Sequence, residues 1–385
     1  MKNKLKILLN SNATWSPSGY GQQAGQFLPL MAGDGHECSC IAYDGLQAGI
    51  INIGGITYLP RINDPYGADA ILEHADRYKP DLIFTLQDVW TINNLALKYL
   101  KDNGFKWVPI VPVDHEPVPS YILEKLKMAY RIITISRFGH DELKKNGFDS
   151  TYIPHTVDTG MFRRMEQKEC RKFIGVPDNV FLFGMVAANK ENPPRKSFQQ
   201  VLDAFKLFRD AQPGSAIYFH TLMDSVDGFP IQRYAKFLGL EKSVYHSERY
   251  KVLYDIKQEE MPRIYGAFDV LLNPSTREGF GIPIIEAQAC EVPAIVNDFT
   301  SMRELVNEGV DGYKVKVAYK RFTQLLSYEG VPDVNDLYEK MAASFRADRN
   351  EMGKRGRERV VKEYDTKTVY EEKWRPFLKE ISKDL

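Results

Sequence analysis

Short apolar runs separated by helix-length segments recur along the whole chain. Such runs predict buried strands, and their alternation with helices predicts an α/β protein with parallel sheets covered on both faces. The segment 197–211 has apolar residues at helical spacing and is expected to be an amphipathic helix. The predicted strands are Lys6–Leu9, Cys38–Ala42, Leu82–Thr85, Val108–Val113 and Ile132–Ile135 in the first half, and Phe181–Val186, Ala216–His220, Val270–Leu272 and Ala294–Val296 in the second.

One segment between the two halves breaks this pattern. The run Ile153-Pro154-His155-Thr156-Val157-Asp158 leads to Phe162 and then to a charged stretch, 163–172. With 385 residues, 43% of them hydrophobic, the chain is long enough to bury two ordinary cores. We therefore expect two domains, residues 1–160 and 161–365, followed by an aromatic-rich helical segment at about 366–385.

Composition narrows the class of protein. Lys plus Arg and Asp plus Glu are both 51, and this balance argues against a general nucleic-acid binder. None of the four cysteines is in a Cys-x-x-Cys pair, which favours a reduced, cytoplasmic protein without structural zinc. The apolar run in Met1–Asn10 is too short for a signal peptide and is expected to be a strand. No run approaches the ~20 apolar residues that span a bilayer, and peripheral membrane association is left open.

The most informative stretch is Glu278-Gly279-Phe280-Gly281-Ile282-Pro283-Ile284-Ile285-Glu286, which follows a predicted strand. Pro283 suits the first position of a helix, and the two glycines let the backbone approach a ligand at a helix N-terminus, which favours anions. Glu278 is expected in the flexible, glycine-flanked part of the loop and Glu286 in the first helical turn. Carboxylates are acceptors suited to sugar and ribose hydroxyls, although an acid in a first turn also commonly complements the helix dipole.

Together with Val292-Pro293-Ala294-Ile295-Val296 and Arg303-Glu304-Leu305-Val306, this stretch resembles the donor site of retaining GT-B glycosyltransferases of the family-four type. The resemblance implies two Rossmann-like domains with parallel sheets facing a central cleft, the first for the acceptor and the second for a nucleotide-sugar donor. It also implies that the C-terminal helix crosses back onto the first domain. The roles it implies are contact with the donor sugar for Glu278, contact with the ribose for Glu286, and donor binding by Gly279, Phe280, Gly281 and Ile282.

The chain departs from the family pattern at three positions. Thr156 and Glu291 stand where the family usually has Gly, and Ala188 stands where it has a phosphate-binding Arg. Arg195 and Lys196 come shortly afterwards, directly before a predicted helix, where a diphosphate would gain both charge and helix amides. We expect this pair to replace the missing Arg, although an Arg-Lys pair is also commonly a solvated surface feature.

The first domain supplies further candidates. Gly19 and Gly21 follow the first strand and are expected near the donor diphosphate, although glycines also mark ordinary turns. His115 follows a strand at the sheet edge where ligands bind, and the family often has a His there near the C6 hydroxyl of the donor sugar; a structural role is the alternative. Asp88 and Tyr20 are candidates for acceptor contact.

The resemblance implies a metal-independent glycosyltransferase without a cofactor, which moves a sugar from a UDP- or GDP-linked donor to a glycan, lipid or other hydroxyl compound with retention of configuration. Catalysis would be largely electrostatic, with Glu278, His115, Arg195 and Lys196 as its residues. No Asp-x-Asp metal clamp is present in the sequence. A nucleotide-sugar epimerase, a phosphorylase and a catalytically silent sugar-nucleotide sensor or scaffold remain open, and Ala188 and Glu291 favour the sensor.

Overall fold

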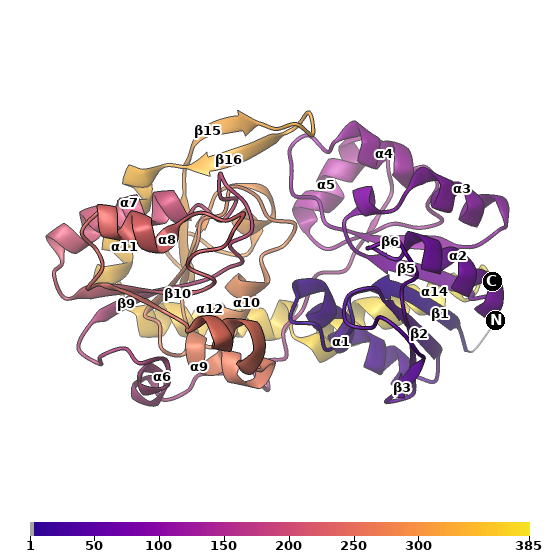
Figure 1. The fold of residues 1–385 in the computed structure, drawn as a ribbon, viewed down its shortest axis with the longest axis horizontal. Coiled ribbons are helices and arrows are strands. Elements are labelled where there is room, and N and C mark those ends of the chain that lie inside the picture. The colour runs from indigo at the N-terminus through magenta and orange to yellow at the C-terminus, as the bar shows by residue number, and fades with distance from the viewer. Residues whose placement is uncertain (1–3) are drawn as a thin grey trace. The chain divides into compact units, whose positions relative to one another are not determined.

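The computed structural model describes residues 4–385, so the start Met1-Lys2-Asn3 lies outside the described residues. The chain forms two compact units. Unit 1 comprises the residues up to Thr156 together with Thr366–Leu385, and unit 2 comprises Val157–Asp365 (Figure 1). The expected boundary after Gly160 and the division after Thr156 lie in the same linker. Among the described residues, no helix is both long and apolar enough to cross a membrane.

Unit 1 is built on an eight-stranded sheet with the order β3-β4-β2-β1-β5-β6-β7-β8, parallel except for the β3–β4 pair. The first strand lies inside the sheet, so the chain leaves it in both directions and creates a switch point between β1 and β5. The five expected strands are present, and β3, β4 and β8 were not expected. The strands are β1 Lys6–Ser11, β2 Glu37–Ala42, β3 Ile51–Ile53, β4 Ile56–Leu59, β5 Leu82–Leu86, β6 Trp107–Val111, β7 Ile133–Thr134 and β8 Thr151–Tyr152.

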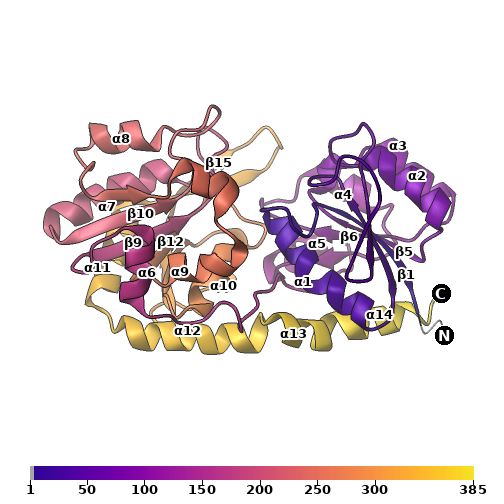
Figure 2. The same cartoon turned by 60° about the horizontal axis from the view of Figure 1, so that its bottom comes forward.

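Helices cover both faces of this sheet. Leu8 and Ile83 pack on one face with residues of α2 and α3. On the other face the ring of Trp374 contacts Phe84 and stacks on Phe27, which holds the C-terminal segment beside α1 (Figure 2). The helical elements are α1 Gly19–Gly33, α2 Ala68–Tyr78, η1 Val89–Thr91, α3 Asn94–Asp102, α4 Ser120–Leu126, α5 Arg137–Lys145, α13 Thr366–Val369, η5 Tyr370–Trp374 and α14 Arg375–Ile381.

Unit 2 contains a six-stranded parallel sheet with the order β11-β10-β9-β12-β13-β14. Its first strand, β9, again lies inside the sheet, and the switch point falls between β9 and β12, where ligands of such sheets bind beyond the carboxyl ends of the strands. The four expected strands are present, and β11 and β14 were not expected. The strands are β9 Phe181–Val186, β10 Ser215–His220, β11 Val244–His246, β12 Val270–Asn273, β13 Ala294–Asn297 and β14 Gly312–Val315.

The expected amphipathic helix of unit 2 is α7. Its Phe205 and Phe208 pack with Phe183 of β9, which covers one face of the sheet. The helical elements of unit 2 are α6 Gln167–Ile174, α7 Phe198–Ala211, α8 Ile231–Phe237, η2 Lys251–Asp255, η3 Gln258–Glu260, α9 Met261–Tyr265, α10 Ile282–Ala289, η4 Thr300–Glu304, α11 Val334–Arg346 and α12 Arg349–Glu363.

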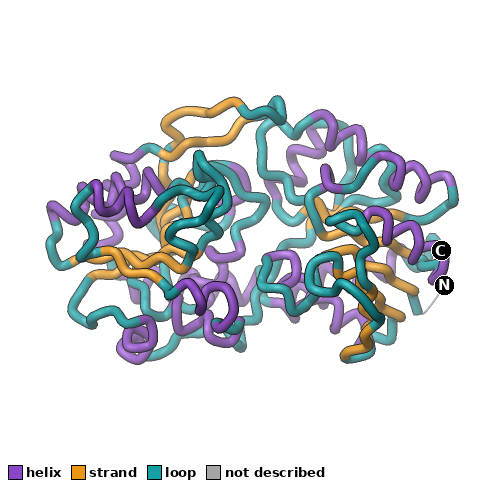
Figure 3. Tube along the Cα trace, in the orientation of Figure 1, coloured by secondary structure: helices purple, strands orange, loops and turns teal. Residues whose placement is uncertain are grey.

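An antiparallel hairpin that was not expected separates β14 from α11. Its strands, β15 Val317–Phe322 and β16 Tyr328–Pro332, form a two-stranded sheet of their own, drawn in orange apart from the main sheet in Figure 3. The loop of the hairpin, 323–327, has no Gly, Pro, Asn or Asp, so the usual turn signal is absent from the sequence.

Candidate functional site

Three charged side chains meet at the switch point of unit 2. Arg195 and Lys196 follow β9, and Glu278 follows β12. Arg195 Nη1 donates to Glu278 Oε2 at 3.0 Å, and Lys196 Nζ donates to Glu278 Oε1. Ser275 Oγ donates to the same Oε1 at 2.7 Å. The structure therefore brings together three of the four residues for which the sequence analysis expected a catalytic role.

Burial and charge together set the ionisation of this cluster. Burial alone would raise the pKa of Glu278, but the charges of Lys196 and Arg195 outweigh it and lower the pKa to about 2. Burial and the like charge of Arg195 lower the pKa of Lys196 to about 8, although Glu278 opposes this shift. At neutral pH the cluster therefore holds one carboxylate and two cations.

Glu278 is fixed in place, and the expectation that it lies in a flexible part of the loop was wrong. Its backbone N–H donates to Thr300 Oγ1 at 3.2 Å, and Ser301 Oγ donates to the carbonyl oxygens of Glu278 and Phe280 at 2.8 Å each. The residue is 8% exposed. These contacts from the segment after β13 hold the loop in one conformation, although Gly279 and Gly281 flank it.

The position of Glu286 also differs from the expectation. Helix α10 begins at Ile282, so Pro283 is its second residue and Glu286 lies beyond the first turn. The hydroxyl of Tyr265 donates to Glu286 Oε2 at 2.6 Å. Burial, followed by the charge of Glu286, raises the pKa of Tyr265 well above its usual value, so this hydroxyl stays a donor. Glu286 is buried and does not serve to complement the helix dipole.

The glycine-rich turn before α10 gives each of its residues a distinct environment. Gly281 is the N-cap with φ at 110°, a left-handed conformation that a side chain would strain. Phe280 is buried, and its ring packs edge-on against Tyr364 at 5.8 Å between centroids. Gly279 and Ile282 are half-buried at the surface of the turn. The side chain of Phe280 therefore belongs to the core, and only its backbone is suited to contact a ligand.

Residues that the sequence analysis missed support the same loop. Glu329 of β16 accepts from Thr276 Oγ1 at 2.8 Å and from Arg277 Nε at 3.3 Å. The other carboxylate oxygen of Glu329, Oε1, accepts from Arg321 Nε at 2.5 Å. Asn273, at the end of β12, is 1% exposed, and neither polar atom of its amide has a hydrogen-bond partner among the described residues. The position of Asn273 at the end of a predicted strand could have identified it as a candidate. Nothing in the sequence links Glu329 to a loop some fifty residues earlier.

In unit 1, the two candidates for acceptor contact lie together. The hydroxyl of Tyr20, on α1, donates to Asp88 Oδ1 at 2.9 Å. Asp88 follows β5, and Asn10, at the end of β1, donates to the neighbouring Gln87 at 2.6 Å. Burial and the Asp88 charge raise the pKa of Tyr20 well above its usual value. These polar groups surround the switch point between β1 and β5.

The two glycines of unit 1 lie in the first turn of α1, which begins at Gly19. A Cβ on Gly21 would lie 2.5 Å from the carbonyl oxygen of Ala13 and 2.8 Å from that of Ser16. Ser18 Oγ accepts from the N–H of Gly21 at 3.1 Å and caps the helix. Close packing of the β1–α1 loop is therefore sufficient to require Gly21, and no contact in the structure tests a role in donor binding.

His115 has one ring nitrogen engaged and one that is not. Its Nδ1 lies 2.6 Å from Asp114 Oδ1, so Nδ1 carries the proton in the neutral tautomer and Nε2 is left as an acceptor. His115 is 3% exposed, and Nε2 has no hydrogen-bond partner among the described residues. A buried acceptor of this kind is suited to a hydroxyl group of a ligand.

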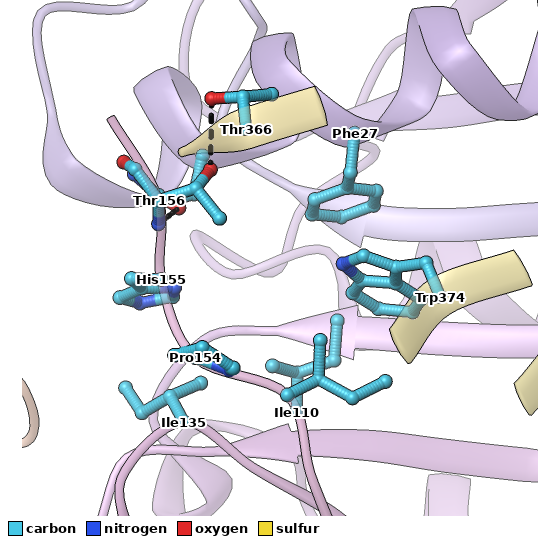
Figure 4. Close-up of a pocket in the computed structure, with 10 residues that line it drawn as sticks. Phe27, Ile110, Ile135, Pro154, His155, Thr156, Thr366 and Trp374 are labelled. Atoms are coloured by element: carbon cyan, nitrogen blue, oxygen red, sulfur yellow. Dashed lines mark hydrogen bonds between the residues drawn. The ribbon is translucent and has the colours of Figure 1, made fainter. Parts of the chain in front are cut away.

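Two other histidines have structural surroundings. His155 lines a cavity of about 10 Å³ in unit 1, beside Thr156, Phe27 and Trp374, and burial lowers its pKa to about 3 (Figure 4). That volume accommodates about one water molecule and no sugar. His220 Nδ1 lies 2.7 Å from Ser247 Oγ, and burial lowers its pKa to about 4.

Glu291, at a position where the family usually has Gly, lies in the turn before β13. Glu291 adopts φ at 61°, the left-handed conformation for which glycine is suited. Its carboxylate pairs with Arg164 Nη1 at 3.0 Å, outside the Arg195–Glu278 cluster. A non-glycine residue in this conformation introduces local strain, and the ion pair with Arg164 holds its side chain. Among the described residues, no group of three or more His, Cys, Asp or Glu side chains is placed to hold a metal ion.

Comparison with known proteins gives this arrangement a family. The family model described as glycosyl transferases group 1 matches residues 166–328, which include Arg195, Lys196, Glu278 and Glu286. The capsular polysaccharide biosynthesis glycosyltransferase CapM of Staphylococcus aureus is 30% identical over 314 residues, covering 76% of this chain and 71% of that protein. The chain belongs to the group 1 glycosyltransferase family. With three further curated relatives, the alignments cover only 14%, 39% and 17% of the relatives' length.

Solved structures show the fold of this group 1 family member. Sucrose-phosphate synthase from Thermosynechococcus elongatus matches with a TM-score of 0.76 and 17% identity, over 98% of this chain and 100% of that chain. Anabaena HepE, in a complex with UDP and glucose, matches with a TM-score of 0.71 and 16% identity, over 99% of this chain and 100% of that chain. The fold is therefore GT-B, with a Rossmann-like parallel sheet in each unit, as the sequence analysis predicted.

Proposed function

We propose that the protein is a glycosyltransferase that binds a nucleotide-sugar donor on unit 2 and moves the sugar to a hydroxyl acceptor with retention of configuration. The observation that carries the proposal is the cluster of Arg195, Lys196 and Glu278 at the switch point between β9 and β12. In a nucleotide sugar, one oxygen joins the anomeric carbon to phosphorus, so sugar-binding and phosphate-binding groups must be neighbours. A carboxylate for hydroxyls and two cations for phosphate meet that requirement.

The nucleotide is assigned to the neighbouring helix α10. Glu286 is the proposed acceptor for the ribose hydroxyls, with Tyr265 fixing its carboxylate through the 2.6 Å hydrogen bond. Gly279, Gly281 and Ile282 border the N-terminus of α10, where backbone amides and the helix dipole favour a phosphate. HepE binds UDP, and we propose a UDP- or GDP-linked donor here.

The ionisation of Glu278 supports a reaction without a covalent intermediate on that residue. With a pKa of about 2 it is not a proton donor at neutral pH, and hydrogen bonds from Lys196, Arg195 and Ser275 weaken it as a nucleophile. We propose that the acceptor hydroxyl attacks from the face that the diphosphate leaves. The bond from the anomeric carbon to the phosphate oxygen breaks, the bond to the acceptor oxygen forms, and the hydroxyl proton goes to the diphosphate.

The remaining roles belong to unit 1. His115 Nε2 is the proposed acceptor for a sugar hydroxyl, and Tyr20 and Asp88 are the proposed contacts to the acceptor substrate. No metal ion and no cofactor enters this scheme, because Arg195 and Lys196 supply the positive charge that stabilises the leaving diphosphate.

A catalytically silent sugar-nucleotide sensor is the second candidate, favoured by Ala188 at the position of the family's Arg. A thermal-shift screen of nucleosides, nucleoside diphosphates and nucleotide sugars, followed by assays for release of the diphosphate, separates the two. The transferase proposal predicts that UDP or GDP raises the melting temperature more than its nucleoside does, and that the matching nucleotide sugar is turned over. Stabilisation without any release identifies a sensor, and absence of stabilisation contradicts both.

A further inference from the structure

The hairpin β15–β16 has an unusual concentration of exposed apolar side chains. Tyr319, Phe322, Leu326 and Tyr328 are 57%, 58%, 69% and 40% exposed. Single exposed apolar residues are normal on a protein surface, but Phe322, Leu326 and Tyr328 are close together at the tip end of the hairpin, whereas Tyr319 lies on the opposite face of β15.

At the tip of the hairpin, an exposed leucine adopts a strained backbone conformation. The loop is closed by the N–H of Thr323, which donates to the carbonyl oxygen of Ser327 at 2.9 Å. Within it Leu326 adopts φ at 55°, a left-handed conformation that Gly or Asn fills more easily than a bulky residue. The backbone conformation of Leu326 is unfavourable, and its exposed side chain contributes little to the stability of the fold. The leucine is therefore better explained by a contact with another molecule.

The exposed charge of the hairpin is positive. The hairpin, 317–332, contains two basic residues, Lys320 and Arg321, and one acidic residue, Glu329, and Lys316 directly precedes it. Glu329 is buried and paired with Arg321. The side chain of Lys316 is 81% exposed, and its ion pair with Asp336 is long at 3.8 Å. The hairpin therefore complements an anionic surface.

These groups follow a definite order along the hairpin. The loop 323–327 holds Leu325 and Leu326 and has no charged residue. Next come Phe322 and Tyr328, a cross-strand pair with ring centroids 5.3 Å apart, and then the lysines towards the root. The same order is found across a membrane interface, where apolar side chains enter the acyl boundary, aromatic rings lie among the headgroups, and basic residues meet anionic lipid.

We propose that the β15–β16 hairpin docks the protein on an anionic lipid bilayer through Leu326, Phe322 and Tyr328, with Lys316 as an electrostatic contact. The first half of β16 is joined to the donor loop, since Glu329 accepts from Thr276 and the N–H of Gly330 donates to the Thr276 carbonyl oxygen at 2.9 Å. Taken with the transferase function proposed above, on which this last step rests, docking favours a lipid-linked hydroxyl compound as the acceptor.

Co-sedimentation of the full chain with vesicles of phosphatidylcholine and phosphatidylglycerol in equal parts tests the docking without any nucleotide or turnover. We expect binding to these vesicles, little binding to pure phosphatidylcholine, and weakening when the salt rises from about 0.1 M to about 0.5 M. The double variant Phe322→Thr/Leu326→Asn should lower the partition coefficient at least tenfold, because each buried CH₂ adds about 0.8 kcal/mol to membrane affinity and the loss of two such groups already corresponds to about tenfold. Lys316→Gln should lower it about fivefold.

Matched variants on α8 provide the controls. Phe237→Ser removes an apolar side chain that is 82% exposed, and Lys236→Gln removes an exposed charge; neither should change vesicle binding. Leu326→Asn alone should raise the melting temperature while weakening vesicle binding, which rules out misfolding as the cause. The proposal is overturned if the chain does not bind anionic vesicles, if the double variant binds as well as the wild type, or if sedimentation analysis shows that the hairpin instead holds two copies of the chain together.

Discussion

At the scale of single residues, the site depends on the balance of charge between one carboxylate and two cations. Glu278 neutralises part of the positive charge of Arg195 and Lys196, and its own pKa falls to about 2 as a result. A diphosphate arriving beside the two cations meets groups that are already oriented, so little reorganisation accompanies binding.

Removal of Glu278 separates sugar positioning from nucleotide binding. In Glu278→Ala the diphosphate replaces the carboxylate as the anionic partner that raises the pKa of Lys196, so we expect affinity for the nucleoside diphosphate to be maintained. Transfer from any accepted donor should fall by roughly 100-fold or more, the scale of a lost positioning contact. Calorimetry and turnover measured on the same preparation check this, and full activity of the variant would remove the sugar site from this loop.

The ribose role of Glu286 has its own test. Glu286→Gln keeps the shape of the side chain and an acceptor for Tyr265 but removes the charge, so nucleotide affinity should weaken by about 1–3 kcal/mol. Calorimetric titration with the nucleoside diphosphate measures this change. Unchanged affinity would show that Glu286 is a buried structural acid only.

The lowered pKa of Lys196, about 8, predicts a pH dependence of binding. Diphosphate favours the protonated amine, so affinity should be constant below about pH 8 and should fall as the amine loses its proton above it, by up to about tenfold per pH unit. The variant Lys196→Arg is the matched control, because a guanidinium stays charged throughout this range. A fall of the same size in both proteins would assign the pH effect to another group.

At the scale of elements, the donor loop is supported by three segments: the one after β9 through Arg195, the one after β13 through Thr300 and Ser301, and β16 through Glu329. The hairpin is therefore part of the architecture of the site. This coupling explains why a loop with two glycines holds Glu278 in one place.

Loss of Glu329 should loosen that support. Glu329→Ala leaves Arg277 and Arg321 without this carboxylate and deprives Thr276 of its acceptor, so unfolding free energy should fall by about 1–3 kcal/mol and the KM for the donor should rise. Glu351→Ala, which breaks the exposed ion pair with Arg355, is the control and should cost less than about 1 kcal/mol. Equal losses in both variants would show that Glu329 has no special role.

The sequence predicted the repeating strands and singled out Arg195, Lys196 and Glu278 as candidates, because hydrophobic periodicity and short motifs are local signals. It could not predict that these residues form ion pairs, since the partners are 82 and 83 positions apart and only the sheet order makes them neighbours. The start of α10 was misplaced by one residue because Gly281 caps the helix in a left-handed conformation. The hairpin was missed because a strained Leu326 replaces the usual turn residue.

At the scale of the whole molecule, the two units have the same arrangement of strands around their candidate sites. A parallel sheet with its first strand inside creates a switch point, and the polar residues follow the strands that border it: Tyr20 and Asp88 in unit 1, and Arg195 and Glu278 in unit 2. The family model matches within unit 2, so the donor side of the proposal has more support than the acceptor side.

The proposed function depends above all on the binding of a donor diphosphate by the cations at the β9–β12 switch point. The most direct measurement is calorimetric titration of the wild type and of Arg195→Ala/Lys196→Ala with a nucleoside diphosphate and with its bare nucleoside. We expect the double variant to lose much more affinity for the diphosphate than for the nucleoside, because only the diphosphate contacts the two cations. Equal losses for the two ligands, or no loss for either, would contradict it.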